Sequence, residues 1–190
     1  MPALSTPGTR IEIGDLVAYL DADGGFLRAI AVAGEEVLRG IGFVVRDQHW
    51  GTYPLCAAPE IARGADKAVI RAAGRVTGPD GALDWSLVWT LRRDGLTAEC
   101  DCTSAGGFPT NRTGFVVLHS LQAARGQAVA ITHEAGQVEE TVFPDLVSPH
   151  QPFMDVAAMD YATATGHRLR LRFAGEIFET EDQRNWTDAS

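Results

Sequence analysis

Residues that could do chemistry gather in four short segments of this 190-residue chain: RDQHWGTYP (46–54), GGFPTNRTGFVVLHS (106–120), FPDLVSPHQPFMD (143–155) and EDQRNWTD (181–188). The first three mix proline or glycine with histidine, asparagine, arginine or an aromatic residue, and such loops carry function more often than strand faces do. Amides, guanidinium groups and carboxylates can pair with hydroxyl groups, and an indole can stack on the apolar face of a sugar ring. These segments therefore indicate a carbohydrate site.

We expect two roles among these residues. A histidine beside a carboxylate is suited to general acid–base catalysis, and a guanidinium group can supply donors to a developing oxyanion. The catalytic candidates are His150, His119 and Asp182. The substrate-binding candidates are Asn111, Arg112, His49, Trp50, Gln151, Arg184, Asn185 and Trp186. We predict that the 111–112 pair, the two catalytic histidines and the 182–186 segment meet in one concave region.

Each candidate also has a structural alternative. His119 follows an apolar run and could sit at the core edge, bonded to a backbone carbonyl, while His150 lies between two prolines and could only fix a turn. Asn111 and Arg112 could cap backbone groups in an irregular loop, and residues 181–188 could be a salt-bridged connector. For the C-terminal segment we predict order through a buried Trp186, with Arg184 paired to a carboxylate and Asn185 bonded to backbone.

Other signatures of catalysis are missing from the sequence. It contains no G-x-S-x-G elbow, H-E-x-x-H pair, P-loop or G-x-G-x-x-G turn. Three histidines and several carboxylates could build a metal site in three dimensions, but no local spacing supports one. The odd count of three cysteines argues against a disulfide framework, so we expect free thiols, buried or half-buried, and neither a cofactor nor a metal.

The composition excludes several classes of partner. The formal net charge is −9 and no basic patch is visible, which argues against nucleic acid and against anionic membrane surfaces. No window approaches the length of a membrane span, and the N-terminus lacks the apolar core of a signal peptide. These features favour the cytoplasm.

The elements that must position these loops are strands. LDWSLVWTL (83–91) and HRLRLRF (167–173) alternate apolar and polar residues with a period of two, which is typical of half-buried strands. We predict that the apolar faces, including Trp85, Trp89, Leu169, Leu171 and Phe173, are buried and that Arg168, Arg170 and Arg172 face water. Turn signals lie between such runs at 21–25, 33–36, 78–81, 92–95 and 133–136. The pattern predicts an all-β fold, a large antiparallel two-sheet β-sandwich, with a turn of helix allowed only near residues 59–65.

Four motifs carry a family resemblance. WGTYP, TNRTGFVVLH, FPDLVSPHQPF and FETEDQRNWTDAS resemble the N-terminal part of the D-apionate lactonase family, from about residue 25 to the end. The sequence departs from the expected motif at Ser120, where a proline would follow the histidine. The resemblance implies a galactose-mutarotase-like supersandwich, followed in the family by a TIM barrel and a further β domain. It also implies a reaction, the opening of D-apionolactone to D-apionate.

The resemblance leads to expectations about domains and function. Residues 1–190 should form a single β-sandwich domain, with 1–10 a candidate for disorder and 181–190 a junction to a domain absent from this chain. The expected partners are a sugar or sugar lactone and the missing C-terminal domains. In isolation the chain should be an inactive sugar-binding or structural domain of a lactonase. The alternative is a stand-alone mutarotase-like epimerase that uses histidine and carboxylate chemistry.

Overall fold

The computed structural model describes residues 8–186, apart from the side chain of Trp186. In this part of the chain nearly all regular structure is β-strand, and every pair of neighbouring strands is antiparallel. The two exceptions are one helical turn, α1 (Leu121–Ala124), and one 3₁₀ turn, η1 (Gln183–Trp186). The predicted all-β antiparallel class is therefore confirmed.

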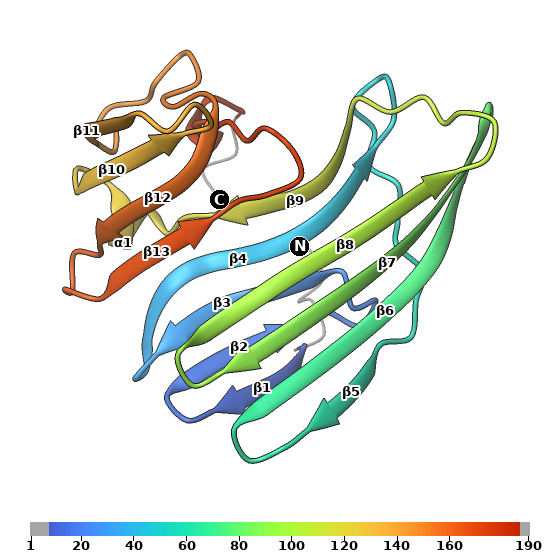
Figure 1. Cartoon of the computed structure of the whole chain (residues 1–190), viewed down its shortest axis with the longest axis horizontal. Coiled ribbons are helices and arrows are strands. Elements are labelled where there is room, and N and C mark those ends of the chain that lie inside the picture. Colours follow the sequence, from blue (N-terminus) through green and yellow to red (C-terminus); the bar gives the residue numbers. More distant parts are fainter. Residues whose placement is uncertain (1–7, 187–190) are drawn as a thin grey trace, which may run out of the picture. The chain divides into compact units, whose positions relative to one another are not determined.

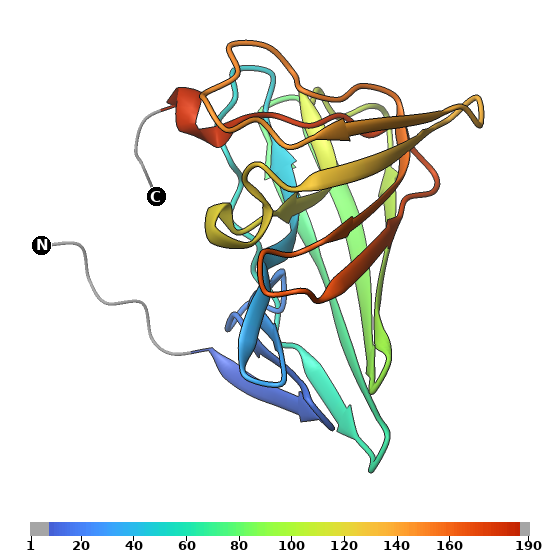
Figure 2. The ribbon, with the colours of Figure 1, turned by 90° about the vertical axis from the view of Figure 1, so that its left-hand side faces the viewer.

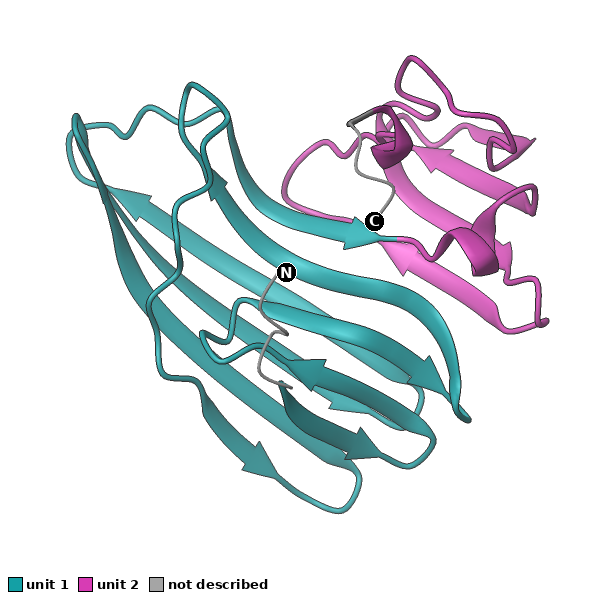
Figure 3. Cartoon of the chain, turned by 180° about the vertical axis from the view of Figure 1, so that it is seen from behind, with its two compact units in different colours: residues 1–118 teal, residues 119–190 magenta. Residues whose placement is uncertain are grey.

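The chain divides into two compact units, one ending at Leu118 and the other beginning at His119 (Figure 3). The strands of unit 1 are β1 (Thr9–Ile13), β2 (Leu16–Leu20), β3 (Phe26–Val32), β4 (Glu35–Arg46), β5 (Glu60–Arg63), β6 (Lys67–Gly78), β7 (Gly81–Arg92), β8 (Gly95–Ser104) and β9 (Arg112–Leu118). The strands of unit 2 are β10 (Ala128–His133), β11 (Val138–Val142), β12 (Val156–Ala162) and β13 (Arg168–Arg172).

Unit 1 is a two-layer sandwich. A five-stranded sheet in the order β1-β2-β3-β4-β9 faces a four-stranded sheet in the order β5-β6-β7-β8 (Figure 1). Aromatic rings join the layers: the ring centroids of Trp89 on β7 and Phe115 on β9 are 5.5 Å apart. The indole N–H of Trp89 also donates to the Gly24 carbonyl at 2.9 Å, which satisfies its polar atom inside the core.

The alternating apolar residues of β7 form the centre of this core. Leu83, Trp85, Leu87, Trp89 and Leu91 are all buried, as the sequence predicted. Each faces the opposite sheet because successive side chains of a strand point to opposite sides.

Unit 2 is a single four-stranded sheet in the order β11-β10-β12-β13. One face carries a cluster of buried side chains: Ala124, Val129, Ile131, Phe143, Phe153, Val156, Met159 and Tyr161. The arginines of β13 point to the other face and are exposed, as predicted, whereas Leu169, Leu171 and Phe173 are only partly buried. The reason is that β13 is an edge strand and has a neighbour on one side alone.

Several predictions of turns and strands can be judged directly. All five predicted turns join paired antiparallel strands. The turn of helix allowed near 59–65 is wrong, because residues 60–63 form β5 and pair with β6. Disorder over residues 1–10 is wrong for Thr9 and Arg10, which lie in β1, while residues 1–7 lie outside the description.

The hydrogen bonding yields three sheets, one more than the two that were predicted. Unit 1 supplies the predicted pair of sheets, and β10 to β13 pair only with one another. Period two shows that a strand is half-buried, but it does not say which sheet the strand joins. All three cysteines are free, as expected, although Cys56 and Cys102 are exposed rather than buried.

Candidate functional site

A tight loop after β4 presents Trp50. The Asp47 carboxylate accepts the backbone N–H groups of His49 at 2.7 Å and Gly51 at 2.8 Å. The backbone closes the same turn, since the Asp47 N–H donates to the Gly51 carbonyl at 2.8 Å and the Trp50 N–H donates to the Asp47 carbonyl at 3.1 Å. We call residues 47–51 the Trp50 loop. Its four hydrogen bonds hold the backbone in one conformation.

Trp50 itself is exposed and strained. Its side chain is 51% exposed, and its φ of +70° lies in the left-handed region that residues other than glycine rarely adopt. Strain of this kind persists only where surrounding contacts impose it, and it gathers at ligand sites. The guanidinium carbon of Arg112 lies 5.6 Å from the centroid of the indole, within the range of a cation–π contact.

The second chemistry-bearing segment lies beside the first. Residues Arg46 and Arg112 are register partners of β4 and β9, 66 positions apart in the chain. The Arg46 carbonyl accepts the Asn111 N–H at 3.1 Å and the Thr110 hydroxyl at 2.7 Å. Four of the predicted substrate-binding residues, His49, Trp50, Asn111 and Arg112, therefore lie near one another in unit 1, in the loop after β4 and at the start of β9.

A small cleft opens next to this loop. It has a volume of about 120 Å³ and is lined by Asp47, Gln48, His49, Tyr53, Gly78, Pro79, Asp80, Phe108 and Pro109. Tyr53 and Phe108 form one wall, with ring centroids 5.5 Å apart. The volume is well below the roughly 300 Å³ of an ordinary small-molecule pocket, so the cleft could receive only part of a sugar. The sequence reasoning missed Tyr53 and Phe108, although both lie in segments that it had singled out, and it took Asp80 only as part of the turn at 78–81.

The remaining predicted residues lie in unit 2. Arg184 and Asp182 form an ion pair with 2.8 Å between Nη2 and Oδ2, and the Asn185 amide donates to the Ser148 carbonyl. Both partnerships confirm the predictions for these side chains. The pKa of Asp182 is lowered to about 2, chiefly by its hydrogen bond with Arg184 and also by the Ser148 N–H, which donates at 2.8 Å. The predicted burial of Trp186 concerns a side chain outside the description.

His119 lies among aromatic rings of unit 2. Its Nδ1 is 2.8 Å from the hydroxyl of Tyr161, and its ring centroid is 5.5 Å from that of Phe143. Burial lowers the pKa of His119 to about 4, because the charged imidazolium loses its solvation there. Burial also raises the pKa of Tyr161, so the phenol stays protonated. A neutral imidazole can act as a base, but Nδ1 of this one is already engaged in a hydrogen bond with the phenol.

His150 and Gln151 are exposed. The backbone carbonyl of His150 accepts the Ser148 hydroxyl at 2.8 Å, which fits the alternative that this histidine fixes a turn. The catalytic roles of His150, His119 and Asp182 stay predictions. So does the meeting of unit 1 and unit 2 residues in one concave region.

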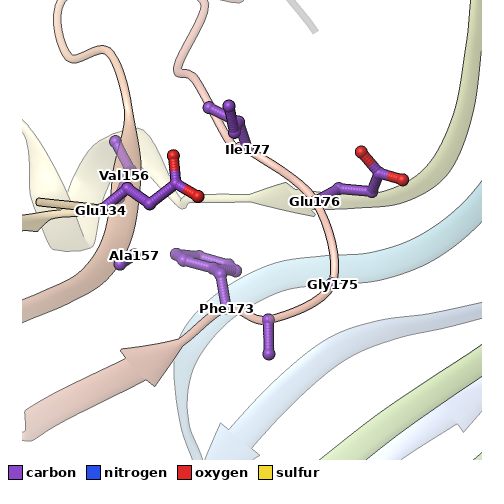
Figure 4. Close-up of a pocket in the computed structure, with 8 residues that line it drawn as sticks. Glu134, Val156, Ala157, Phe173, Gly175, Glu176 and Ile177 are labelled. Atoms are coloured by element: carbon purple, nitrogen blue, oxygen red, sulfur yellow. The ribbon is translucent and has the colours of Figure 1, made fainter.

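Unit 2 also holds a pocket that the sequence reasoning missed (Figure 4). It has a volume of about 260 Å³ and is lined by Glu134, Val156, Ala157, Phe173, Ala174, Gly175, Glu176 and Ile177. Glu134 and Glu176 stand above an apolar floor that includes Phe173 (Figure 4). No motif pointed to these residues, because the two glutamates lie 42 positions apart in turns of ordinary composition.

Neither a metal-binding cluster nor a membrane-spanning helix is found within residues 8–186. No group of three or more His, Cys, Asp or Glu side chains is placed to hold a metal ion there. In the same part of the chain, no helix is long and apolar enough to cross a membrane.

Unit 1 is thus an all-β module with an exposed tryptophan and, next to its loop, a small cleft lined by carboxylate, amide, imidazole and aromatic side chains. Comparison with known proteins is more specific. The family described as "D-apionate lactonase, N-terminal domain" matches residues 3–190, so the chain belongs to this family. A D-apionate lactonase of Brucella anthropi is 37% identical over 185 residues, which cover 96% of this chain and 30% of that relative. The chain thus spans under a third of the length of its curated relative, and no solved structure matches it.

Proposed function

We propose that this chain is the N-terminal β domain of a carbohydrate-lactone hydrolase that opens D-apionolactone to D-apionate. On its own the chain binds the sugar or its lactone and does not turn it over. Membership of the D-apionate lactonase family across residues 3–190 is the observation that carries the reaction class. The Trp50 loop supports the binding role.

The geometry of unit 1 explains how a sugar ring would be held. The indole of Trp50 offers an apolar surface to the C–H face of the ring, and the loop is already fixed, so little order is lost on binding. His49, Gln48 and Asp80 line the adjoining cleft and can exchange hydrogen bonds with hydroxyl groups. The Arg112 guanidinium can donate to a lactone carbonyl or to the carboxylate of the product acid.

Three finer points belong to the same proposal. The fold is of the galactose-mutarotase-like supersandwich type, which the two facing antiparallel sheets of unit 1 support. The protein works in the cytoplasm, a reducing compartment that suits three free thiols. The catalytic machinery is completed by other domains of the lactonase, since the relative extends well beyond the region matched here.

The test measures binding and turnover separately. Isothermal titration with D-apionolactone and with D-apionate should give saturable binding to the chain. In a pH-stat assay, the full-length Brucella relative should release acid from the lactone while the chain alone releases none above the buffer rate. Acid release by the chain alone would contradict the proposal that this domain binds the lactone without hydrolysing it. Faster exchange of sugar anomers in NMR spectra would instead support the epimerase.

A further inference from the structure

A loop of unit 2 exposes two apolar side chains. Leu146 is 81% exposed and Val147 is 48% exposed, although both belong to the motif-bearing segment after β11. Residues 144–148 are called the Leu146 loop below. Singly exposed apolar residues are normal on a surface, so exposure alone assigns no role to Leu146 and Val147. The order of the loop that carries them is the second observation.

The backbone of this loop is held by the last described turn of the chain. The Arg184 guanidinium donates to three successive carbonyls, of Asp145 at 2.8 Å, Leu146 at 3.0 Å and Pro144 at 3.1 Å. Asp182 accepts the Ser148 N–H, and Asn185 donates to the Ser148 carbonyl. Five hydrogen bonds thus connect residues 182–185 to the Leu146 loop, and η1 lies beside it in Figure 2.

Fixing the backbone of a loop in this way costs conformational entropy, and an exposed turn without such hydrogen bonds keeps that entropy. The Arg184 fork leaves the loop backbone ordered while the Leu146 side chain stays in water. Because the loop is ordered before binding, docking of its apolar side chains has a lower cost in conformational entropy.

The position of the loop says which partner it fits. The described chain ends at η1, directly against the Leu146 loop, so a segment continuing from there is tethered next to it. A tether of this kind raises the effective concentration of the following part to about the millimolar range. The curated relative carries most of its length outside the region that this chain matches, and the matched family is named as an N-terminal domain.

We propose that Leu146 and Val147 dock into an apolar socket on the part of the lactonase polypeptide that follows this domain. The proposal rests on the proposed function, because it takes the chain to be one domain of a longer lactonase. The exposed carboxylate of Asp145, which pairs with Arg125 at 3.2 Å, stands at the rim of the docking surface. The socket should therefore be rimmed by hydrogen-bond donors or basic groups.

The experiment compares the 190-residue chain with the complete polypeptide encoded by its gene. Each is produced as the Leu146→Cys variant and treated with a maleimide, and labelling is measured at every cysteine by peptide mass spectrometry. Val138→Cys is the matched control, since Val138 is also an exposed apolar residue of unit 2, at 60%. The native Cys56 and Cys102 serve as internal references for reagent activity.

Labelling at position 146 should be at least tenfold slower in the complete polypeptide than in the chain, while position 138 reacts equally in both. Equal rates at position 146, or a gene product that ends at Ser190, would overturn the proposal. Protection of position 146 that grows with the concentration of the chain alone would assign the surface to a second copy instead.

A second variant covers the case in which the new thiol disturbs docking. Leu146→Ser should lower the melting temperature of the complete polypeptide and leave that of the chain unchanged, with Val138→Ser altering neither. Unchanged melting of both proteins would contradict the docking role. Because these readouts need no sugar, failure of docking and failure of sugar binding remain distinguishable.

Discussion

At the scale of single residues, Trp50 holds a conformation that is costly for stability. A left-handed backbone costs a residue with a Cβ roughly 1–2 kcal/mol, and a glycine in its place would avoid that strain. The Asp47 carboxylate and the closing backbone bonds maintain the conformation. Under the proposed function, the half-exposed indole held in this position is the surface that contacts the sugar.

Trp50→Gly should therefore separate binding from stability. Loss of the stacking surface should weaken binding of the sugar lactone about tenfold, which corresponds to about 1.4 kcal/mol. The melting temperature should stay the same or rise, because the strain is relieved. Ala33→Gly is the control, since Ala33 also has a positive φ, of +52°, and should change stability without changing affinity. A lower melting temperature with unchanged affinity would indicate that Trp50 is structural.

His119 should make unit 2 sensitive to mild acid. Its pKa is about 4 in the folded chain against 6.5 in the unfolded state, so the unfolded chain binds more protons between these values. Stability is then fully present above about pH 6.5 and falls as the pH is lowered towards about 4, with a loss of roughly 2 kcal/mol at about pH 5. Urea unfolding at about pH 7 and about pH 5 measures this difference, which His119→Gln should largely remove.

Asp182 provides an internal contrast to this histidine. The pKa of Asp182 in the folded chain, about 2, lies below the ordinary value of 3.8. Its contribution to the free energy of unfolding is therefore present above about pH 3.8 and is lost only as the pH falls through about 2. The two groups therefore act in separate pH windows. A loss of stability at about pH 5 that persists in His119→Gln would have to come from another group.

At the scale of elements, glycines of β4 let an aromatic ring lie flat on the strand. A Cβ built on Gly42 would meet ring carbons of Phe26 at 2.1 Å, and one on Gly40 would meet the same ring at 2.6 Å. Phe26 and Gly42 are cross-strand partners in β3 and β4. The Phe26 ring also makes a cation–π contact, since the guanidinium carbon of Arg28 lies 4.2 Å from its centroid.

Gly42→Ala should consequently destabilise unit 1 by about 1–3 kcal/mol, the usual cost of overpacking. Gly64→Ala is the control, since its nearest neighbour would lie at an ordinary 3.4 Å. Urea unfolding of both variants gives the comparison. In the double variant Gly42→Ala/Phe26→Ala the cost should be much less than the sum of the single costs, because the clashing ring is gone. Additive costs would contradict the proposed clash.

The sequence could predict elements because their patterns are local. Alternation in β7 identified the buried face correctly, and all five turns fell where glycine and acidic residues mark them. The same reasoning failed at β5, where EIAR forms a strand only because the long strand β6 offers it an edge. It also overstated the burial of Leu169 and Leu171, since a period of two does not show that β13 is an edge strand.

The candidate site was predictable in its parts but not in its assembly. The residue types in 46–54 and 106–120 indicated a binding loop in each segment. Their meeting depends on the pairing of β4 with β9, a contact between distant parts of the chain that no local pattern encodes. The pocket with Glu134 and Glu176 was missed for the same reason, as its walls come from β12, the turn after β10 and the segment that follows β13.

At the scale of the whole molecule, the two units have separate sheets and separate clusters of buried side chains. Each of the three sheets draws its strands from one unit alone. Unit 2 has its own cluster of buried side chains, centred on β10 and β12, while the core of unit 1 lies between its two sheets. The sequence predicted one domain over residues 1–190, and cooperativity of unfolding decides whether the units behave as one.

We predict that damage to one core stays within its unit. Ile131 of unit 2 and Ile70 of unit 1 are both fully buried, at 0% exposure, so truncation to alanine should cost each unit about 2–5 kcal/mol. Native-state hydrogen exchange resolves where that cost appears. In Ile131→Ala the amides of β10 and β12 should exchange faster while those of β6 and β7 keep their protection, and Ile70→Ala should give the reverse. The paired variants control for each other, because they remove the same atoms from equally buried positions. If either variant accelerates both sets of amides equally, the 190 residues unfold as the single cooperative domain that the sequence predicted, and separate sheets and cores do not make separate folding units.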